Sequence, residues 1–281
     1  MSYTHPPPIA VTFTRSNHYR VSSLGSWSFP LKPDYQSIAS NLIDQLALTI
    51  PPITVSVVSS MPDGIPAFAG TAAAGCQFWE KAAAGAFVTS TPDHELCAIG
   101  VHTHQMADPS EACQKELGEA LGVFQELTYV RSDDVPRIPV MSQPSKHVVY
   151  APLAQSPVSP DVVLLFANAS RSLVITEAVE QVESGIPPAL GRPACAAIPQ
   201  AINTGRAALS LGCCGARAYL DGLRDDIAMW AIPGAQIETY AERIGALTNA
   251  NDILTKFHST RRADIEAGGR PTLQESLDRI S

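Results

Sequence analysis

The chain has 281 residues, of which 45% are hydrophobic and only 16% are charged. This apolar content is enough to bury a sizeable core, which excludes a wholly disordered chain. The formal net charge is −8, so the chain lacks the positive field that attracts proteins to phosphate backbones. We therefore expect a small-molecule substrate and no nucleic-acid partner.

No apolar run approaches the roughly 20 residues that span a bilayer, so we expect no membrane partner. Residues 1–23 contain three consecutive prolines and no continuous apolar stretch, unlike a secretory signal. These features predict a soluble, cytoplasmic protein. In a reducing compartment, six cysteines point to metal binding or catalysis more often than to disulfides.

Residues 1–32 are rich in Ser, Pro and Thr, which indicates a partly ordered N-terminal arm. Residues 34–48 have apolar side chains at spacings of three and four, which predicts a helix with Asp34 as its N-cap. The β-branched run 53–58 predicts a strand, and a helix is expected between Cys76 and Gly85.

A longer helix is predicted over residues 109–127, with an apolar stripe that includes Cys113. Residues 147–153 and 161–167 predict two strands, and residues 170–183 predict a helix. The last strong helix is expected over 236–258, packed on the core, with a homodimer seam as the alternative. Residues 260–281 are expected to form a polar C-terminal tail.

Strands that alternate with helices predict an α/β or α+β fold, with a mixed sheet and flanking helices. We expect a single globular domain over residues 33–259. A duplication into pseudo-symmetric βα halves, about 33–145 and 146–259, is one interpretation of a recurring order. Each half has a strand, a cysteine, a glycine and a second cysteine, which are Cys76, Gly85 and Cys97 in one half and Cys195, Gly205 and Cys213 in the other.

If the halves are related by a twofold axis, Cys76, Cys97, Cys195 and Cys213 converge at their interface. Four thiolates at one point suit an iron–sulfur cluster or zinc, because soft sulfur ligands favour these metals. The chain lacks the tight cysteine pairs of zinc ribbons and ferredoxins. Small, buried, unligated cysteines are therefore the structural alternative.

Two basic residues are candidates to bind an anionic substrate. Arg217 follows the Gly-flanked pair Cys213 and Cys214 and is a candidate to orient an anionic substrate or stabilise a thiolate. Lys81 is a second candidate for the substrate anion. Adjacent cysteines do not easily point at one metal, so one of this pair is expected to be structural.

Other candidates for chemistry are weaker. Cys113 shares a helical face with apolar residues and is expected in the core. His102 and His104 would share one face of a strand and hold a metal, but we favour two exposed loop histidines. The segment 93–95, Asp-His-Glu, is interpreted as a turn or helix start.

The sequence resembles the domain-of-unknown-function family 169, the ArCR group of archaea and bacteria, over about residues 51–233. The matching stretches are Cys76–Gly85, Thr91–Cys97, Ala151–Leu153, Pro160–Phe166, Gly191–Cys195 and Ser210–Arg217. The resemblance implies that Cys76, Cys97, Cys195 and Cys213 are the characteristic cysteines. Cys113 and Cys214 match no position of the family. The resemblance implies a shared fold but no established activity.

Three functions follow from these residues. The first is a lyase, dehydratase or sulfur-removing enzyme in which the four cysteines hold a four-iron cluster, or three of them do and leave one iron open as a Lewis acid. Arg217 and Lys81 would orient a small anionic substrate. The second is a metal-free thiol enzyme of a small-molecule pathway, in which one cysteine, with Cys213 as the candidate, acts as nucleophile or as acid/base. The third is a non-catalytic metal-binding or structural zinc protein.

Overall fold

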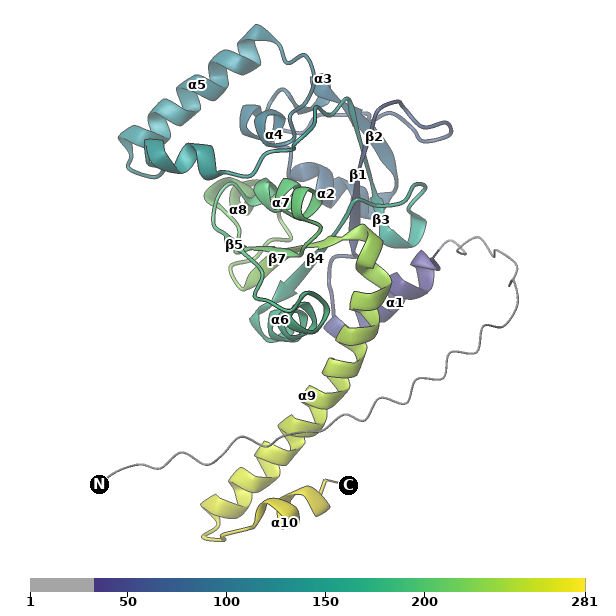
Figure 1. Ribbon diagram of the computed structural model, residues 1–281, viewed down its shortest axis with the longest axis vertical. Helices are drawn as coiled ribbons and strands as arrows, with labels where there is room; N and C mark the ends of the chain where they lie inside the picture. Colours follow the sequence, from purple (N-terminus) through teal and green to yellow (C-terminus); the bar gives the residue numbers. More distant parts are fainter. Residues whose placement is uncertain (1–32, 281) are drawn as a thin grey trace, which may run out of the picture. The chain divides into compact units, whose positions relative to one another are not determined.

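The computed structural model describes residues 33–280, and its centre is a mixed seven-stranded sheet in the order β2-β3-β1-β4-β7-β6-β5 (Figure 1). Neighbouring strands are antiparallel except β5 and β6, which are parallel. The strands are β1 (Ile53–Val58), β2 (Phe87–Ser90), β3 (His147–Pro152), β4 (Val162–Asn168), β5 (Ala189–Leu190), β6 (Ala208–Ser210) and β7 (Ile227–Pro233). This sheet with its flanking helices confirms the expected fold class.

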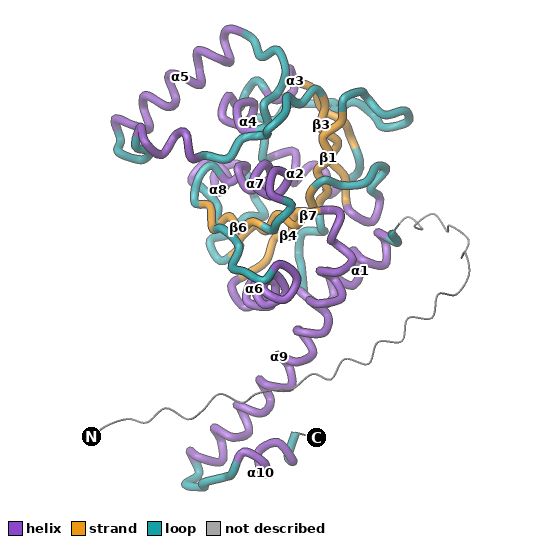
Figure 2. The backbone as a smooth tube through the Cα atoms, viewed as in Figure 1, coloured by secondary structure: helices purple, strands orange, loops and turns teal. Residues whose placement is uncertain are grey.

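Three helices cover one face of the sheet (Figure 2): α1 (Tyr35–Leu46), α6 (Ala169–Glu183) and α9 (Ile237–Glu266). They pack on alternate residues of the central strands, among them Val163, Leu165 and Trp230. The short helix α10 (Leu273–Asp278) contacts the far part of α9.

The other face carries α2 (Gln77–Lys81), α7 (Ala197–Thr204) and α8 (Cys214–Tyr219). Near the β2 edge lie α3 (Thr91–His94) and α4 (Ala98–Thr103), and α5 (Glu111–Glu126) packs on α4 (Figure 1). The intervening strand residues, such as Leu164 and Tyr150, belong to this second core. Because side chains alternate along a strand, each central strand contributes to both cores.

Local sequence explains where several elements begin. The Asp34 carboxylate accepts a hydrogen bond from the Ser37 amide at 3.1 Å, which confirms the predicted N-cap of α1. The predicted strand 53–58 is β1 itself, and β3, β4 and α6 lie within a residue of their predicted bounds. The N-terminal arm lies outside the described residues.

Some local structure was predicted incompletely or not at all, including strands β2, β5 and β6. The last helix does not end at His258 but continues to Glu266, because the chain has no Gly or Pro between Gly245 and Gly268. It therefore runs into the segment expected to be a polar tail. Strand β7 was not predicted, since its Ala-Met-Trp-Ala centre is buried on both faces and shows no alternation.

The two halves of the chain contribute their strands in the same order. In the first half, β1 is innermost and is followed outward by β3 and β2; in the second, β4, β7 and β6 follow in the same order, and β5 lies outside β6. The halves meet where β1 and β4 pair antiparallel, with Thr54 opposite Val163. Internal duplication would produce this arrangement. No described helix is long and apolar enough to cross a membrane.

Candidate functional site

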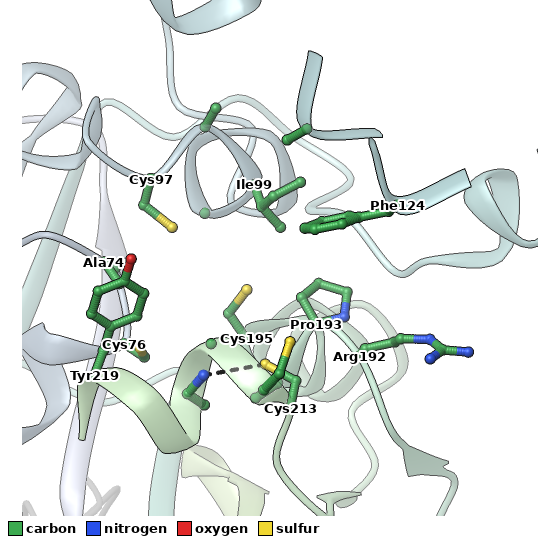
Figure 3. A pocket seen from close by; sticks show the side chains of 18 of the residues that line it. Ala74, Cys76, Cys97, Ile99, Phe124, Arg192, Pro193, Cys195, Cys213 and Tyr219 are labelled. Carbon is green, nitrogen blue, oxygen red and sulfur yellow. Dashed lines mark hydrogen bonds between the residues drawn. The ribbon is translucent and has the colours of Figure 1, made fainter. Parts of the chain in front are cut away.

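Five of the six cysteines line one cavity of about 290 Å³ on the face that carries α2, α7 and α8, and four of them are predicted site residues. These four are Cys76, Cys97, Cys195 and Cys213, the residues singled out by their spacing. Figure 3 shows Cys97 facing Cys195 and Cys213 across this cavity. All are free thiols. The fold thus brings together side chains that are up to 137 positions apart in sequence.

Each cysteine stands at the start of a short helix, in matching places of the two halves. Cys76 directly precedes α2, and Cys195 lies in the 3₁₀ turn Ala194–Ala196 that leads into α7. Cys97 is the N-cap residue of α4, and Cys213 is the N-cap residue of α8. Cys97 follows β2 in the chain and Cys213 follows β6, and each of these strands is the third of its half, counted outward from β1 or β4.

Polar and steric contacts hold three of the sulfurs in place. The Ala216 amide donates a hydrogen bond to Cys213 Sγ at 3.4 Å. Thr103 Oγ1 lies 3.3 Å from Cys195 Sγ, which joins α4 of one half to the turn before α7 of the other. A Cβ atom on Gly100 would lie 3.1 Å from Cys97 Sγ, so the absence of a side chain there leaves room for the thiol.

The surroundings disfavour thiolates at two of these positions. Burial raises the pKa of the Cys76 thiol to about 12, and the charges of Cys97 and Cys213 add to the effect. Burial is also the main cause of a raised pKa at Cys195, with Cys97 the next contributor. In the absence of a nearby cation, the thiols of Cys76 and Cys195 are protonated at neutral pH and are weak nucleophiles.

The four cysteine sulfurs suit a thiophilic metal, but they are too far apart to bind a single metal ion. Within residues 33–280, no three Cys, His, Asp or Glu side chains are close enough to hold one metal ion. Tetrahedral zinc with Zn–S bonds of about 2.3 Å requires its sulfurs within about 4 Å of one another. In a four-iron cluster each thiolate binds a different iron, so sulfurs spread around a cavity fit that group better.

The remaining two cysteines have separate roles. Cys113 is the buried residue of α5 and packs in the core, as predicted. Cys214 is exposed, and its sulfur lies 3.2 Å from the hydroxyl of Tyr129 at the rim of the cavity. Of the adjacent pair, Cys213 is therefore the residue whose sulfur caps a helix inside the site, while Cys214 lies at its edge.

The two predicted basic residues are not placed alike. Arg217 lines a shallow recess beside the cavity, but its guanidinium donates to the backbone carbonyls of Leu211, Arg224 and Ile227. It holds the loops around Cys213 together. Lys81 is exposed at the end of α2 and is not among the residues that line the cavity.

The histidines differ from the expectation of two exposed loop residues. His102 and His104 lie at the end of α4, where residues two apart do not share a face, and His104 is buried with Nδ1 3.0 Å from the Gly100 carbonyl oxygen. His94 is also buried, 2.8 Å from Thr89 Oγ1. The segment 93–95 is part of the turn around α3, as interpreted from sequence.

Sequence reasoning missed part of the cavity wall. Arg192 and Tyr129 line the cavity, and the Arg192 guanidinium stacks 4.2 Å above the Tyr129 ring. The position of Arg192 three residues before Cys195 was the available signal. The apolar stripe of α5 was predicted, but Leu121 and Phe124 face the cavity rather than the core.

Comparison with known proteins identifies the family of the chain but assigns it no activity. No curated protein and no solved structure matches the chain. A family model described as uncharacterised ArCR, domain of unknown function 169, matches residues 41–243. This match covers well over half of the chain and includes the four predicted site cysteines of the cavity. The chain therefore belongs to the uncharacterised ArCR family.

Proposed function

We propose that this protein is an iron–sulfur enzyme of the lyase, dehydratase or sulfur-removing type, which acts on a small anionic molecule. Cys76, Cys97, Cys195 and Cys213 would hold a four-iron cluster. The observation that carries the proposal is the meeting of these four free thiols, from four different elements, around one cavity.

The chemistry of the wall supports a reaction inside the cavity. A four-iron cluster would supply a Lewis acid toward a hydroxyl, carboxylate or sulfur group if three of the cysteines bound iron and the fourth iron were open to substrate. The surrounding side chains are mostly apolar, among them Leu96, Ile99 and Phe124. Such a lining excludes water and strengthens electrostatic interactions within the site.

The helix starts supply fixed polar groups around the sulfurs. The Ala216 amide already donates to Cys213 Sγ, and a hydrogen bond of this kind stabilises negative charge on sulfur. When Cys195 is a thiolate it can only accept, so the Thr103 hydroxyl is then its donor. These two contacts hold and orient thiolates without changing the fold.

A metal-free thiol enzyme is the second candidate, and the amide contact to Cys213 favours it. In that case Cys213 is the nucleophile, and the other three cysteines need not bind metal. A closed zinc site is a weaker candidate, since no three ligands lie close enough for one ion among residues 33–280.

The test is metal content in matched cysteine variants purified without oxygen. The proposal predicts brown protein with about four irons per chain. Serine at position 76, 97, 195 or 213 should lower the iron content severalfold, whereas Cys113→Ser and Cys214→Ser should retain it. Unchanged iron in all four ligand variants contradicts the proposal. Colourless, folded protein with one rapidly alkylated thiol at Cys213 supports the thiol enzyme instead.

We further propose that the protein works in the cytoplasm on a small molecule, without nucleic acid as a partner. Its six free cysteines suit a reducing compartment, and its net charge of −8 disfavours phosphate backbones. Sedimentation of the purified chain would show whether α9 also forms a homodimer seam.

A further inference from the structure

The cavity has an uneven distribution of charge. Its wall is apolar except for the thiols, two tyrosines and two charged residues, Glu116 on α5 and Arg192. A site of about 290 Å³ lies near the lower end of the range of about 300–1,000 Å³ for small-molecule pockets. A compact ligand with an apolar body therefore matches most of this surface.

Arg192 is the basic residue available to such a ligand. It lines both the cavity and the recess at its mouth, and its side chain is exposed. Within residues 33–280, no carboxylate lies within ion-pair distance of Arg192. Its charge is therefore not neutralised by a neighbouring acid.

Tyr129 holds this guanidinium in place. The Arg192 Cζ lies 4.2 Å from the centroid of the Tyr129 ring, and the Tyr129 hydroxyl in turn lies 3.2 Å from Cys214 Sγ. Stacking on an aromatic face leaves the edge of a guanidinium free to donate hydrogen bonds to an anion. The Arg217 guanidinium, in contrast, already donates hydrogen bonds to three backbone carbonyl oxygens.

We propose that the ligand of this cavity has an apolar body and one anionic group, a carboxylate or phosphate, and that Arg192 binds the anion at the mouth. The apolar body lies against Ile99, Leu121 and Phe124, with the four cysteines beneath it. This inference rests on the proposed function for its reaction, but ligand binding itself does not require a metal.

The test uses octanoate as the probe, with 1-octanol and acetate as comparison probes, in titration calorimetry on the full chain. Octanoate should bind more tightly than either of the others. Arg192→Gln should weaken octanoate binding about tenfold, because the charge-assisted hydrogen bond to the carboxylate is lost, and should leave 1-octanol binding unchanged. Arg243→Gln, on an exposed part of α9, is the matched control.

The wild-type chain provides a measurement that needs no variant. Because Arg192 is exposed, raising the salt concentration should weaken octanoate binding and leave 1-octanol binding unchanged. Equal octanoate affinity in Arg192→Gln and wild type, no octanoate binding, acetate binding as tight as octanoate, or no salt effect would each overturn the inference. An octyl phosphate titration then distinguishes phosphate from carboxylate as the preferred anion.

Iron content, measured on the same samples, separates this inference from the proposed function. Iron-free protein that binds octanoate through Arg192 leaves the inference in place and overturns the iron–sulfur proposal. Iron-loaded protein whose octanoate affinity does not depend on Arg192 gives the reverse result.

Discussion

The Thr103 hydroxyl lies 3.3 Å from the sulfur of Cys195, although 92 positions separate them in sequence. Thr103 is fully buried at the end of α4, and the same hydroxyl lies within donating distance of the Gly100 carbonyl oxygen, at 3.1 Å. This contact connects the helix capped by Cys97 to the turn that carries Cys195. It is a direct polar link between cysteine-bearing elements of the two halves.

Replacing Thr103 by Val keeps the shape of the side chain and removes this link. We expect a loss of about 1 kcal/mol in the free energy of unfolding, the usual value for one hydrogen bond. If the hydroxyl orients Cys195 for metal binding, iron content should fall as well. Thr103→Ser retains the hydroxyl and should retain the iron. Equal iron in Thr103→Val and wild type would show that the contact is structural only.

Arg217 is expected to act through the loops that it holds. Arg217→Met removes donors to the carbonyls of Leu211, Arg224 and Ile227 and should cost about 2 kcal/mol in urea unfolding. Arg217→Lys should recover only part of this loss, because one ammonium does not reproduce the planar fork. A variant as stable as wild type would contradict the role of Arg217 as a clamp.

Two glycines provide a matched test of packing. Gly234 follows β7, and a Cβ atom there would overlap the carbonyl oxygen of Pro160, so Gly234→Ala should destabilise by more than about 3 kcal/mol. A Cβ atom on Gly245 in α9 meets nothing within 4 Å. Gly245→Ala should therefore stabilise by up to about 1 kcal/mol in thermal unfolding. Similar effects of both changes would contradict this packing.

Glu183 connects three elements at the opposite face of the sheet. Its buried carboxylate accepts hydrogen bonds from the Tyr240 hydroxyl of α9, from the Ala207 amide at 2.5 Å and from Arg206 Nε at 3.3 Å. Burial first, and then this carboxylate, raise the pKa of Tyr240 above its ordinary value of about 10. The folded chain therefore keeps the Tyr240 proton at pH values where the unfolded chain loses it.

This difference predicts alkaline sensitivity. The stabilisation from Tyr240 is complete below pH about 10, the pKa of tyrosine in the unfolded chain, and declines as the pH rises above it. Tyr240→Phe should be less stable at neutral pH and should show a shallower decline above pH about 10. Tyr219→Phe, at an exposed position, is the control. An unchanged slope in Tyr240→Phe would contradict the assignment.

The sequence by itself determined those parts of the fold that depend on neighbours along the chain. The apolar spacing and the Asp34 cap define α1, and β-branched runs define β1 and much of β4. The spacing of the cysteines also singled out four of those that line the cavity. Periodicity and capping act over a few residues, so they are visible in one sequence.

Only the tertiary structure decided which side chains meet. The antiparallel pairing of β1 with β4 places Ile53 opposite Leu164, and with it the cysteines of one half beside those of the other. The same packing buries His104 and places Arg217 where its guanidinium donates to backbone carbonyls. It leaves Arg192 exposed at the mouth of the cavity. These outcomes depend on contacts between residues far apart in the chain, and no local pattern encodes such contacts.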